Sequence, residues 1–208
     1  MIKANHTFTG QLISRFFAGY RLDKAFRHIY IVGDNLDNHL PVLMIANHFS
    51  WWDGFIQYRL NRQIYKRKLH VMMLEEQLSR HPILTQCGVF SIRKHSREII
   101  ESLNYCIELL EDKNNLVLLF PQGKIESIYT SSFIFEKGLS YIFKHLQNEV
   151  QLIFNVNLIN YFSEKKPSLY IYYKRGILPP SLDIKYIEKD FNRFANTCKL
   201  IQETRWHI

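Results

Sequence analysis

Short apolar runs of strand length recur seven times along this chain of 208 residues, and they limit its possible folds more than any other feature. Each run is rich in Val, Ile, Leu, Phe and Tyr, and polar or turn-forming residues follow most of them. A short continuous apolar run that ends in this way is typical of a buried strand. The predicted strands cover residues 28–33, 41–47, 68–74, 88–93, 115–121, 150–159 and 168–178.

Helical patterns lie between most of these predicted strands. Residues 96–112 carry apolar side chains on one face, with Ser96 as a possible cap, and residues 183–202 show a second helical pattern. Strands that alternate with helices indicate an α/β fold with a mixed, largely parallel sheet flanked by helices. Because 47% of the residues are hydrophobic and no Pro-, Gly- or Ser-rich linker interrupts the chain, residues 1–208 are expected to form a single domain.

The N-terminal residues 1–25 predict an amphipathic helix. Ile13, Phe16, Phe17 and Tyr20 recur at helical spacing, and arginines and lysines flank them. Such a helix either packs on the core or lies on a membrane surface, and both interpretations are open. No apolar run approaches the ~18 residues of a spanning helix, and charges interrupt the N-terminal stretch, so we expect neither a transmembrane segment nor a signal peptide.

The charge of the chain restricts its partners without selecting one. A formal net charge of +8 favours anionic partners, namely phosphate-bearing metabolites, a membrane surface or nucleic acid. No aromatic motif of the RNA-recognition type is present, so nucleic acid is not expected. Cys87, Cys106 and Cys198 have no C-x-x-C spacing, and the histidines lack metal-ligand spacing. We therefore expect no metal site and no disulfide framework, and a reducing compartment.

The segment "NHFSWWD" places an imidazole directly after the predicted strand 41–47. Ser50 and Asp53 have the S-x-x-D spacing of a capping box that opens a helix. If His48 precedes this helix, Asp53 can reach one ring nitrogen, fix the tautomer and leave the other nitrogen as a general base. The alternative is that Asp53 only completes the capping box and His48 is an ordinary turn residue.

Two other predicted strands end in residues that could bind an anion. In "LLFPQGKIES" the turn contains Pro121, Gly123 and Lys124, and its backbone amides could bind an anion or an oxyanion. In "GVFSIRK" the strand ends at Arg93 and Lys94, which could also be a solvated edge. If the three strand ends converge, they form a pocket with a base on one side and cations on the other. The chain contains no G-x-S-x-G, H-E-x-x-H or Walker A motif.

Four segments, in order, resemble the motifs of the glycerolipid acyltransferase family, which includes the 1-acylglycerol-3-phosphate acyltransferases. "NHFSWWD" resembles the motif N-H-x4-D, "GVFSIRK" resembles G-x-F-x-x-R, "FPQGKIES" resembles F-P-E-G-T-R-S, and "FEKGLSYI" resembles the F-K-x-G segment. The resemblance extends over about residues 26–160.

This resemblance implies the transfer of a fatty acyl group from a thioester to a lipid hydroxyl. The donor would be acyl-CoA or acyl carrier protein as co-substrate, without a further cofactor. The protein would be peripheral, at the cytoplasmic face of an anionic membrane. By the resemblance, His48 is the general base and Asp53 its partner. The residues that would hold the acceptor are Arg93, Pro121, Gln122, Gly123 and Lys124.

The third and fourth motifs depart from the family pattern. Gln122 replaces a glutamate, Ile125 stands where the family has an arginine, and Asn155 lies in a segment that lacks the usual proline. Isoleucine cannot replace a bidentate arginine that binds phosphate, although Lys124 could partly compensate. The acceptor is therefore either similar to lysophosphatidic acid or unphosphorylated, such as an aminolipid or a glycosylated pigment or lipid. The alternative function is a non-catalytic, basic lipid-binding protein of the same fold.

Overall fold

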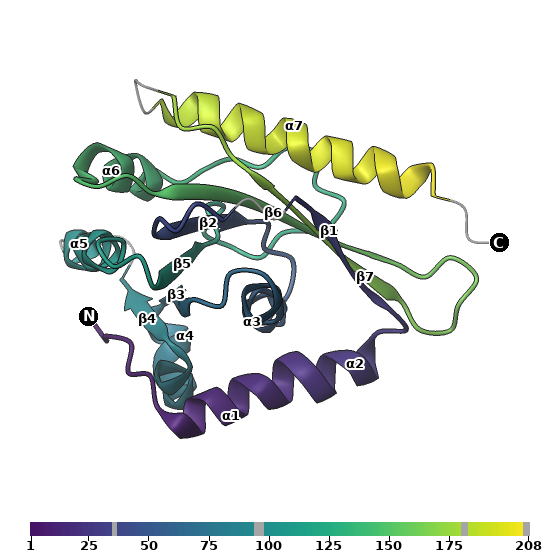
Figure 1. Ribbon diagram of the computed structural model, residues 1–208, viewed down its shortest axis with the longest axis horizontal. Helices are drawn as coiled ribbons and strands as arrows, with labels where there is room; N and C mark the ends of the chain where they lie inside the picture. The colour runs from purple at the N-terminus through teal and green to yellow at the C-terminus, as the bar shows by residue number, and fades with distance from the viewer. Residues whose placement is uncertain (35–36, 94–97, 180–182, 206–208) are drawn as a thin grey trace.

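Seven strands form one sheet at the centre of the computed structural model, which describes residues 1–34, 37–93, 98–179 and 183–205 (Figure 1). All seven predicted strands are confirmed, with ends that differ by a few residues. The strands are β1 (Ile29–Gly33), β2 (Val42–Ala46), β3 (Lys68–Leu74), β4 (Val89–Ile92), β5 (Asn115–Leu119), β6 (Gln151–Asn160) and β7 (Ser168–Arg175).

The sheet is mixed and largely parallel, as predicted. Its strand order is β1-β7-β6-β2-β5-β3-β4. The pair β6–β7 is antiparallel, and the other neighbouring strands pair in parallel. The carboxyl ends of β2, β5, β3 and β4 therefore meet at one edge of the sheet, which is where ligands bind in open α/β sheets.

Helices cover both faces of this sheet, so the fold has three layers (Figure 1). In β2, Leu43 and Ile45 belong to the apolar cluster shared with α5, α6 and α7, while Val42 and Met44 belong to the cluster on the side of α3. Burial on both faces explains why the predicted strands are continuously apolar. The helices are α3 (Asp53–Gln63), α4 (Glu75–Arg80), α5 (Ile99–Leu109), α6 (Gly138–His145) and α7 (Ile184–Glu203), with a 3-10 turn η2 (Pro82–Cys87) after α4.

The predicted helix at 96–112 corresponds to α5, which is shorter, and the one at 183–202 corresponds to α7. Asp183 caps α7, since its side chain accepts a hydrogen bond from the N–H of Lys185. Ser96, the expected cap of α5, and Lys94 lie outside the described residues. No helix in the described part of the chain is long and apolar enough to cross a membrane.

The N-terminal helical segment consists of α1 (Phe8–Phe16), a π-helical turn η1 (Phe17–Arg21) and α2 (Leu22–Ala25). It begins at residue 8 rather than within the first residues, because the Thr7 side chain caps it by accepting from the Gly10 N–H. Before Thr7 the chain runs beside β4, where Ile2 and Ser91 exchange two hydrogen bonds of 2.7 and 2.9 Å.

Three small residues and one leucine form the side of this segment that packs on the protein. Gly10, Ser14, Ala18 and Leu22 are buried, and they recur every four residues. A Cβ atom on Gly10 would lie 1.8 Å from the carbonyl oxygen of Gln86. The close approach of helix and η2 therefore requires glycine at this position.

The apolar face expected from the sequence is only partly buried, which corrects that expectation. Phe17 packs on Phe55 of α3 with ring centroids 4.8 Å apart, but Phe16 and Tyr20 are exposed. The helix thus packs on the protein and still presents apolar side chains to solvent. We call these side chains the exposed stripe: Phe8, Leu12, Phe16 and Tyr20.

Candidate active site

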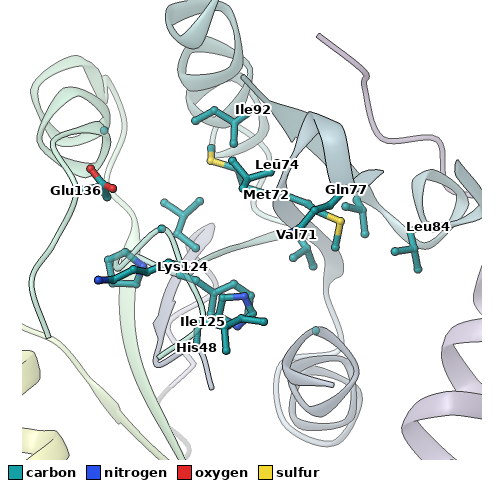
Figure 2. Close-up of a pocket in the computed structure, with 18 of the residues that line it drawn as sticks. His48, Val71, Met72, Leu74, Gln77, Leu84, Ile92, Lys124, Ile125 and Glu136 are labelled. Carbon is teal, nitrogen blue, oxygen red and sulfur yellow. The ribbon is translucent and has the colours of Figure 1, made fainter. Parts of the chain in front are cut away.

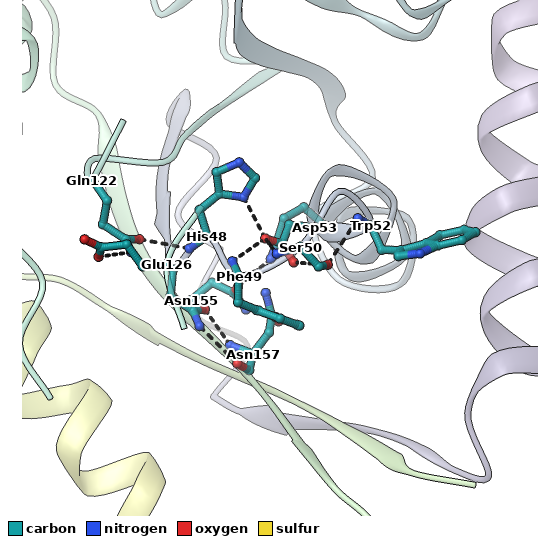
Figure 3. Close-up of polar contacts among 11 residues, drawn as sticks. His48, Phe49, Ser50, Trp52, Asp53, Gln122, Glu126, Asn155 and Asn157 are labelled. Atoms are coloured by element: carbon teal, nitrogen blue, oxygen red, sulfur yellow. Dashed lines mark hydrogen bonds and ion pairs between the residues drawn. The ribbon is translucent and has the colours of Figure 1, made fainter. Parts of the chain in front are cut away.

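His48 and Asp53 lie in direct contact at the carboxyl end of β2. The Nδ1 atom of His48 is 2.7 Å from Oδ2 of Asp53, the first residue of α3 (Figure 3). The Asp53 side chain is fully buried. Its carboxylate also accepts hydrogen bonds from the N–H groups of Phe49 (2.8 Å) and Ser50 (2.9 Å) and from Oγ of Ser50 (3.0 Å). Several donors therefore fix the carboxylate in one position.

This contact assigns the tautomer of the imidazole. A carboxylate accepts hydrogen bonds, so Nδ1 carries the proton and Nε2 of the neutral ring is an acceptor. Figure 3 shows the far edge of the ring directed away from Asp53. The ring stacks on Phe120, with centroids 4.2 Å apart and an angle of 18° between the planes. The His48 ring is thus fixed by Asp53 at Nδ1 and by Phe120 at its face, and Nε2 is left as an acceptor.

The two interpretations of Asp53 made from the sequence are not exclusive. The helix begins at Asp53 and not directly after Ser50, because a turn at Trp51 and Trp52 comes first. The Ser50 Oγ accepts from the Trp52 N–H at 3.1 Å, and the Asp53 carboxylate accepts from the Ser50 N–H. This is half of the expected capping box, because the N-cap residue of α3 is Trp52, which has no side-chain cap. The same carboxylate therefore stabilises the start of α3 and contacts His48.

A pocket of about 430 Å³ opens beside His48, within the size range of small-molecule sites (Figure 2). Its walls are mostly apolar and come from β3, β4, β5, α3, α5 and α6. Pro121, Gly123, Lys124 and Ile125 line it beside the histidine. The apolar residues that line it include Val71, Met72, Leu74, Leu84, Ile92, Leu103 and Ile142.

Gln122 contacts the backbone of His48 instead of lining the pocket. Its Oε1 accepts from the His48 N–H at 2.9 Å, and its Nε2 donates to Oε2 of Glu126 at 2.7 Å. The Glu126 N–H in turn donates to the His48 carbonyl at 2.9 Å. Hydrogen bonds from Gln122 and Lys124 hold the pKa of Glu126 below its usual value. This contact was not predicted from the sequence, although Glu126 stands in the segment "FPQGKIES".

The turn after β5 has the backbone that its sequence requires. Gly123 has a φ of +65°, in the left-handed region that favours glycine, and its N–H donates to the Phe120 carbonyl at 3.0 Å. Pro121 is buried beside it. The N–H groups of Gly123 and Glu126 are thus already used inside the protein.

The two cations expected at the site both form ion pairs with carboxylates. Lys124 Nζ is 3.1 Å from Oε1 of Glu126, although 71% of the Lys124 side chain is exposed. Arg93 pairs with Glu75 and, at 2.5 Å, with Glu98. Hydrogen bonds from Arg93 and Ser91 hold the pKa of Glu75 below its usual value. Arg93 is not among the described residues that line the pocket.

Buried amides join β6 to the strand that carries His48. Asn47 Nδ2 donates to the Asn157 carbonyl at 3.0 Å, and Asn47 Oδ1 accepts from the Asn157 N–H at 2.8 Å. Asn155, in the segment that lacks the family's usual proline, bonds Gln57 of α3 and the Tyr172 carbonyl. Its role is therefore to connect the sheet with α3. Among the described residues, no cluster of three or more His, Cys, Asp or Glu could hold a metal ion.

Comparison with known proteins identifies the family. A family model described as "Acyltransferase" matches residues 28–156, which is more than half of the chain and close to the range of the four motifs. No curated protein sequence matches the chain. A similar solved structure is the 1-acyl-sn-glycerophosphate (LPA) acyltransferase PlsC from Thermotoga maritima, with 16% identity and a TM-score of 0.59, covering 90% of this chain and 79% of that one. The folds are therefore alike, and the chain belongs to the acyltransferase family.

Proposed function

We propose that this acyltransferase moves a fatty acyl group from a thioester, acyl-CoA or acyl carrier protein, to a hydroxyl of a lipid acceptor. His48 is the general base and Asp53 its partner. The observation that carries the proposal is the 2.7 Å contact between Nδ1 and the buried carboxylate, at the edge of an apolar pocket. The same arrangement of base and orienting carboxylate activates hydroxyl nucleophiles in other acyl-transfer enzymes.

The reaction uses the two nitrogens of His48 for different purposes. Nε2 takes the proton of the acceptor hydroxyl while the hydroxyl oxygen attacks the thioester carbonyl carbon. The new C–O bond forms, the C–S bond breaks, and the leaving thiolate recovers the proton from the imidazolium. The Asp53 carboxylate stabilises that imidazolium through Nδ1, and a positioned base of this kind contributes about 10²–10⁴ in rate.

The apolar pocket supports a substrate with an alkyl chain. Its walls carry Val, Leu, Ile and Met side chains, with His48 and Lys124 on one side and Gln77 on the other (Figure 2). Burying a methylene group stabilises a complex by about 0.8 kcal/mol, so a long chain in this pocket contributes strongly to binding. The reacting carbonyl would then lie beside the imidazole.

We infer further that the acceptor hydroxyl belongs to an unphosphorylated lipid. Ile125 lines the pocket where the related family has an arginine. Lys124 is already paired with Glu126, and Arg93 with Glu75 and Glu98. A phosphate would have to displace these carboxylates, and the nearby negative charges would oppose it.

A membrane surface is the expected location of the reaction. The exposed stripe presents two phenylalanines, a leucine and a tyrosine to solvent, and Arg15, Arg21 and Lys24 lie on the same helical segment. Together with a net charge of +8, this combination favours an interface that contains anionic lipids.

The test uses the full-length protein with labelled palmitoyl-CoA or palmitoyl-acyl carrier protein and a total lipid extract spiked with lysophosphatidic acid. Release of free thiol measures turnover of the donor, and mass spectrometry identifies the acylated lipid. We expect thiol release that requires added lipid and an ester product without phosphate. The His48→Ala variant is the control for background hydrolysis.

Each alternative outcome has a distinct meaning. Preferential formation of phosphatidic acid would overturn the acceptor assignment while supporting the reaction. Binding of lipid without thiol release from either donor would contradict acyl transfer and favour a lipid-binding protein of the same fold.

A further inference from the structure

Both backbone polar groups of His48 are bonded to the segment that follows β5. The His48 N–H donates to Oε1 of Gln122 at 2.9 Å, and the His48 carbonyl accepts from the Glu126 N–H at 2.9 Å. The Gln122 Nε2 donates to Oε2 of Glu126 at 2.7 Å and closes the circuit (Figure 3). We call this set of three hydrogen bonds the His48 circuit.

The His48 circuit requires a side chain at position 122 that both accepts and donates, and a hydrogen-bond acceptor at position 126. Gln122 is 4% exposed, and it uses one end as an acceptor and the other as a donor. An ionised glutamate at position 122 is acceptor-only, so it could accept from His48 but would place its second oxygen against the Glu126 carboxylate. The two residues therefore depend on each other.

We propose that Gln122 and Glu126 are positioning residues that fix the backbone of His48 and thereby the direction of Nε2. This proposal rests on the proposed role of His48 as general base. With Asp53 bound to Nδ1, the histidine is held at its N–H, its carbonyl and its ring. A displacement of about 1 Å at a reacting group can cost about 10²-fold in rate, so such support matters for catalysis.

The His48 circuit joins two positions at which the chain departs from the family motif. The motif has a glutamate where this chain has Gln122 and a serine where it has Glu126. In this structure the two side chains are hydrogen-bonded to each other, and Gln122 also accepts from the His48 N–H.

A reciprocal exchange tests this dependence. Gln122→Glu puts two carboxylates together, whereas Glu126→Gln keeps an acceptor for Gln122 Nε2. In the double variant the amide at 126 donates to the carboxylate at 122, which still accepts from His48. The matched control combines Gln122→Glu with Glu136→Gln, which restores the net charge at another pocket residue but not the hydrogen bond.

We expect kcat to fall about 10- to 100-fold in Gln122→Glu, with little change in KM for palmitoyl-CoA. The kcat of Glu126→Gln should stay within about 10-fold of wild type, because the three hydrogen bonds of the His48 circuit can still form. The reciprocal double variant should recover most of kcat, and the charge control should not. Equal recovery in both double variants would show a charge effect and overturn the proposal, as would a kcat near wild type in folded Gln122→Glu.

Hydrogen exchange at the His48 amide provides a readout that does not need activity. We expect faster exchange in Gln122→Glu and wild-type exchange in the reciprocal double variant. If Gln122→Glu does not fold, Gln122→Met, which removes both polar ends without adding charge, replaces it. Unchanged hydrogen exchange at the His48 amide would refute the proposed role of the His48 circuit. Wild-type thiol release that does not depend on His48 would instead refute the proposed function and leave the exchange result interpretable.

Discussion

Asp53→Asn removes the charge beside His48 while keeping the shape of the side chain, and we expect it to slow acyl transfer about 10³-fold. The asparagine oxygen can occupy the place of Oδ2 and accept from His48 Nδ1, Phe49 N–H and Ser50 N–H. Its NH2 group then faces Ser50 Oγ, which can accept a hydrogen bond. The main loss is therefore the negative charge that stabilises the imidazolium.

The magnitude follows from the geometry. The Nδ1–Oδ2 distance is 2.7 Å, and the centres of the two delocalised charges lie farther apart. At about 4 Å and an effective dielectric constant of about 20, opposite unit charges attract by about 4 kcal/mol. Since about 1.4 kcal/mol corresponds to a factor of ten, losing this attraction in the transition state costs about 10³ in kcat. Weaker hydrogen bonds to a neutral group cost about 1–3 kcal/mol of stability in addition.

The assay is thiol release from palmitoyl-CoA in the presence of acceptor lipid, with thermal unfolding of each variant measured in parallel. Ser50→Ala is the matched control, because it removes one donor to Oδ1 and leaves the charge and the His48 contact in place. We expect this control to lose about 1 kcal/mol of stability and less than about 10-fold in kcat. If folded Asp53→Asn is as active as Ser50→Ala, the carboxylate only caps the helix and the reasoning fails.

Three further predictions concern the surface, the thiols and the buried histidines. Replacing Leu12 and Phe16 of the exposed stripe by Ser should abolish pelleting with anionic vesicles without lowering the unfolding temperature; wild-type binding that ignores lipid charge and salt would contradict this. Burial raises the pKa of the Cys87 thiol, so Cys87→Ser should keep acyl transfer, and its loss in a folded variant would indicate a covalent thioester route. Burial lowers the pKa of His6 and of His70 to about 4. As the pH falls, these histidines are therefore protonated in the unfolded chain before they are protonated in the folded one, and the free energy of unfolding should decrease from about pH 6.5 to 4. Denaturant unfolding across this range checks it, and a profile that is equally steep in His70→Asn would contradict the assignment.

The sheet could be predicted from the sequence because buried strands are visible as short apolar runs. The carboxyl end of β2 could also be singled out, since a strand, a histidine and a capping pattern follow each other within residues 41–53. The short helices α4 and α6 have too few turns for a clear periodic pattern.

The packing of the N-terminal segment could not be read from hydrophobicity. Large apolar residues suggested the buried face, but close approach to η2 selects small residues such as Gly10 and Ser14. Likewise, the hydrogen bond between Gln122 and the His48 backbone joins residues 74 positions apart, and a local pattern carries no information about such a contact. These features depend on tertiary geometry.

The most direct test of the central claim is the rate of thiol release by His48→Ala compared with wild type and with His145→Ala, an exposed histidine at the end of α6. The His48 imidazole stacks on Phe120 and bonds Asp53, so His48→Ala should lose some stability, and thermal unfolding of each variant shows that it is folded at the assay temperature. We predict that His48→Ala loses about 10²–10⁴ in kcat and that His145→Ala is unaffected. Wild-type turnover by a folded His48→Ala protein would contradict the role of His48 as the general base.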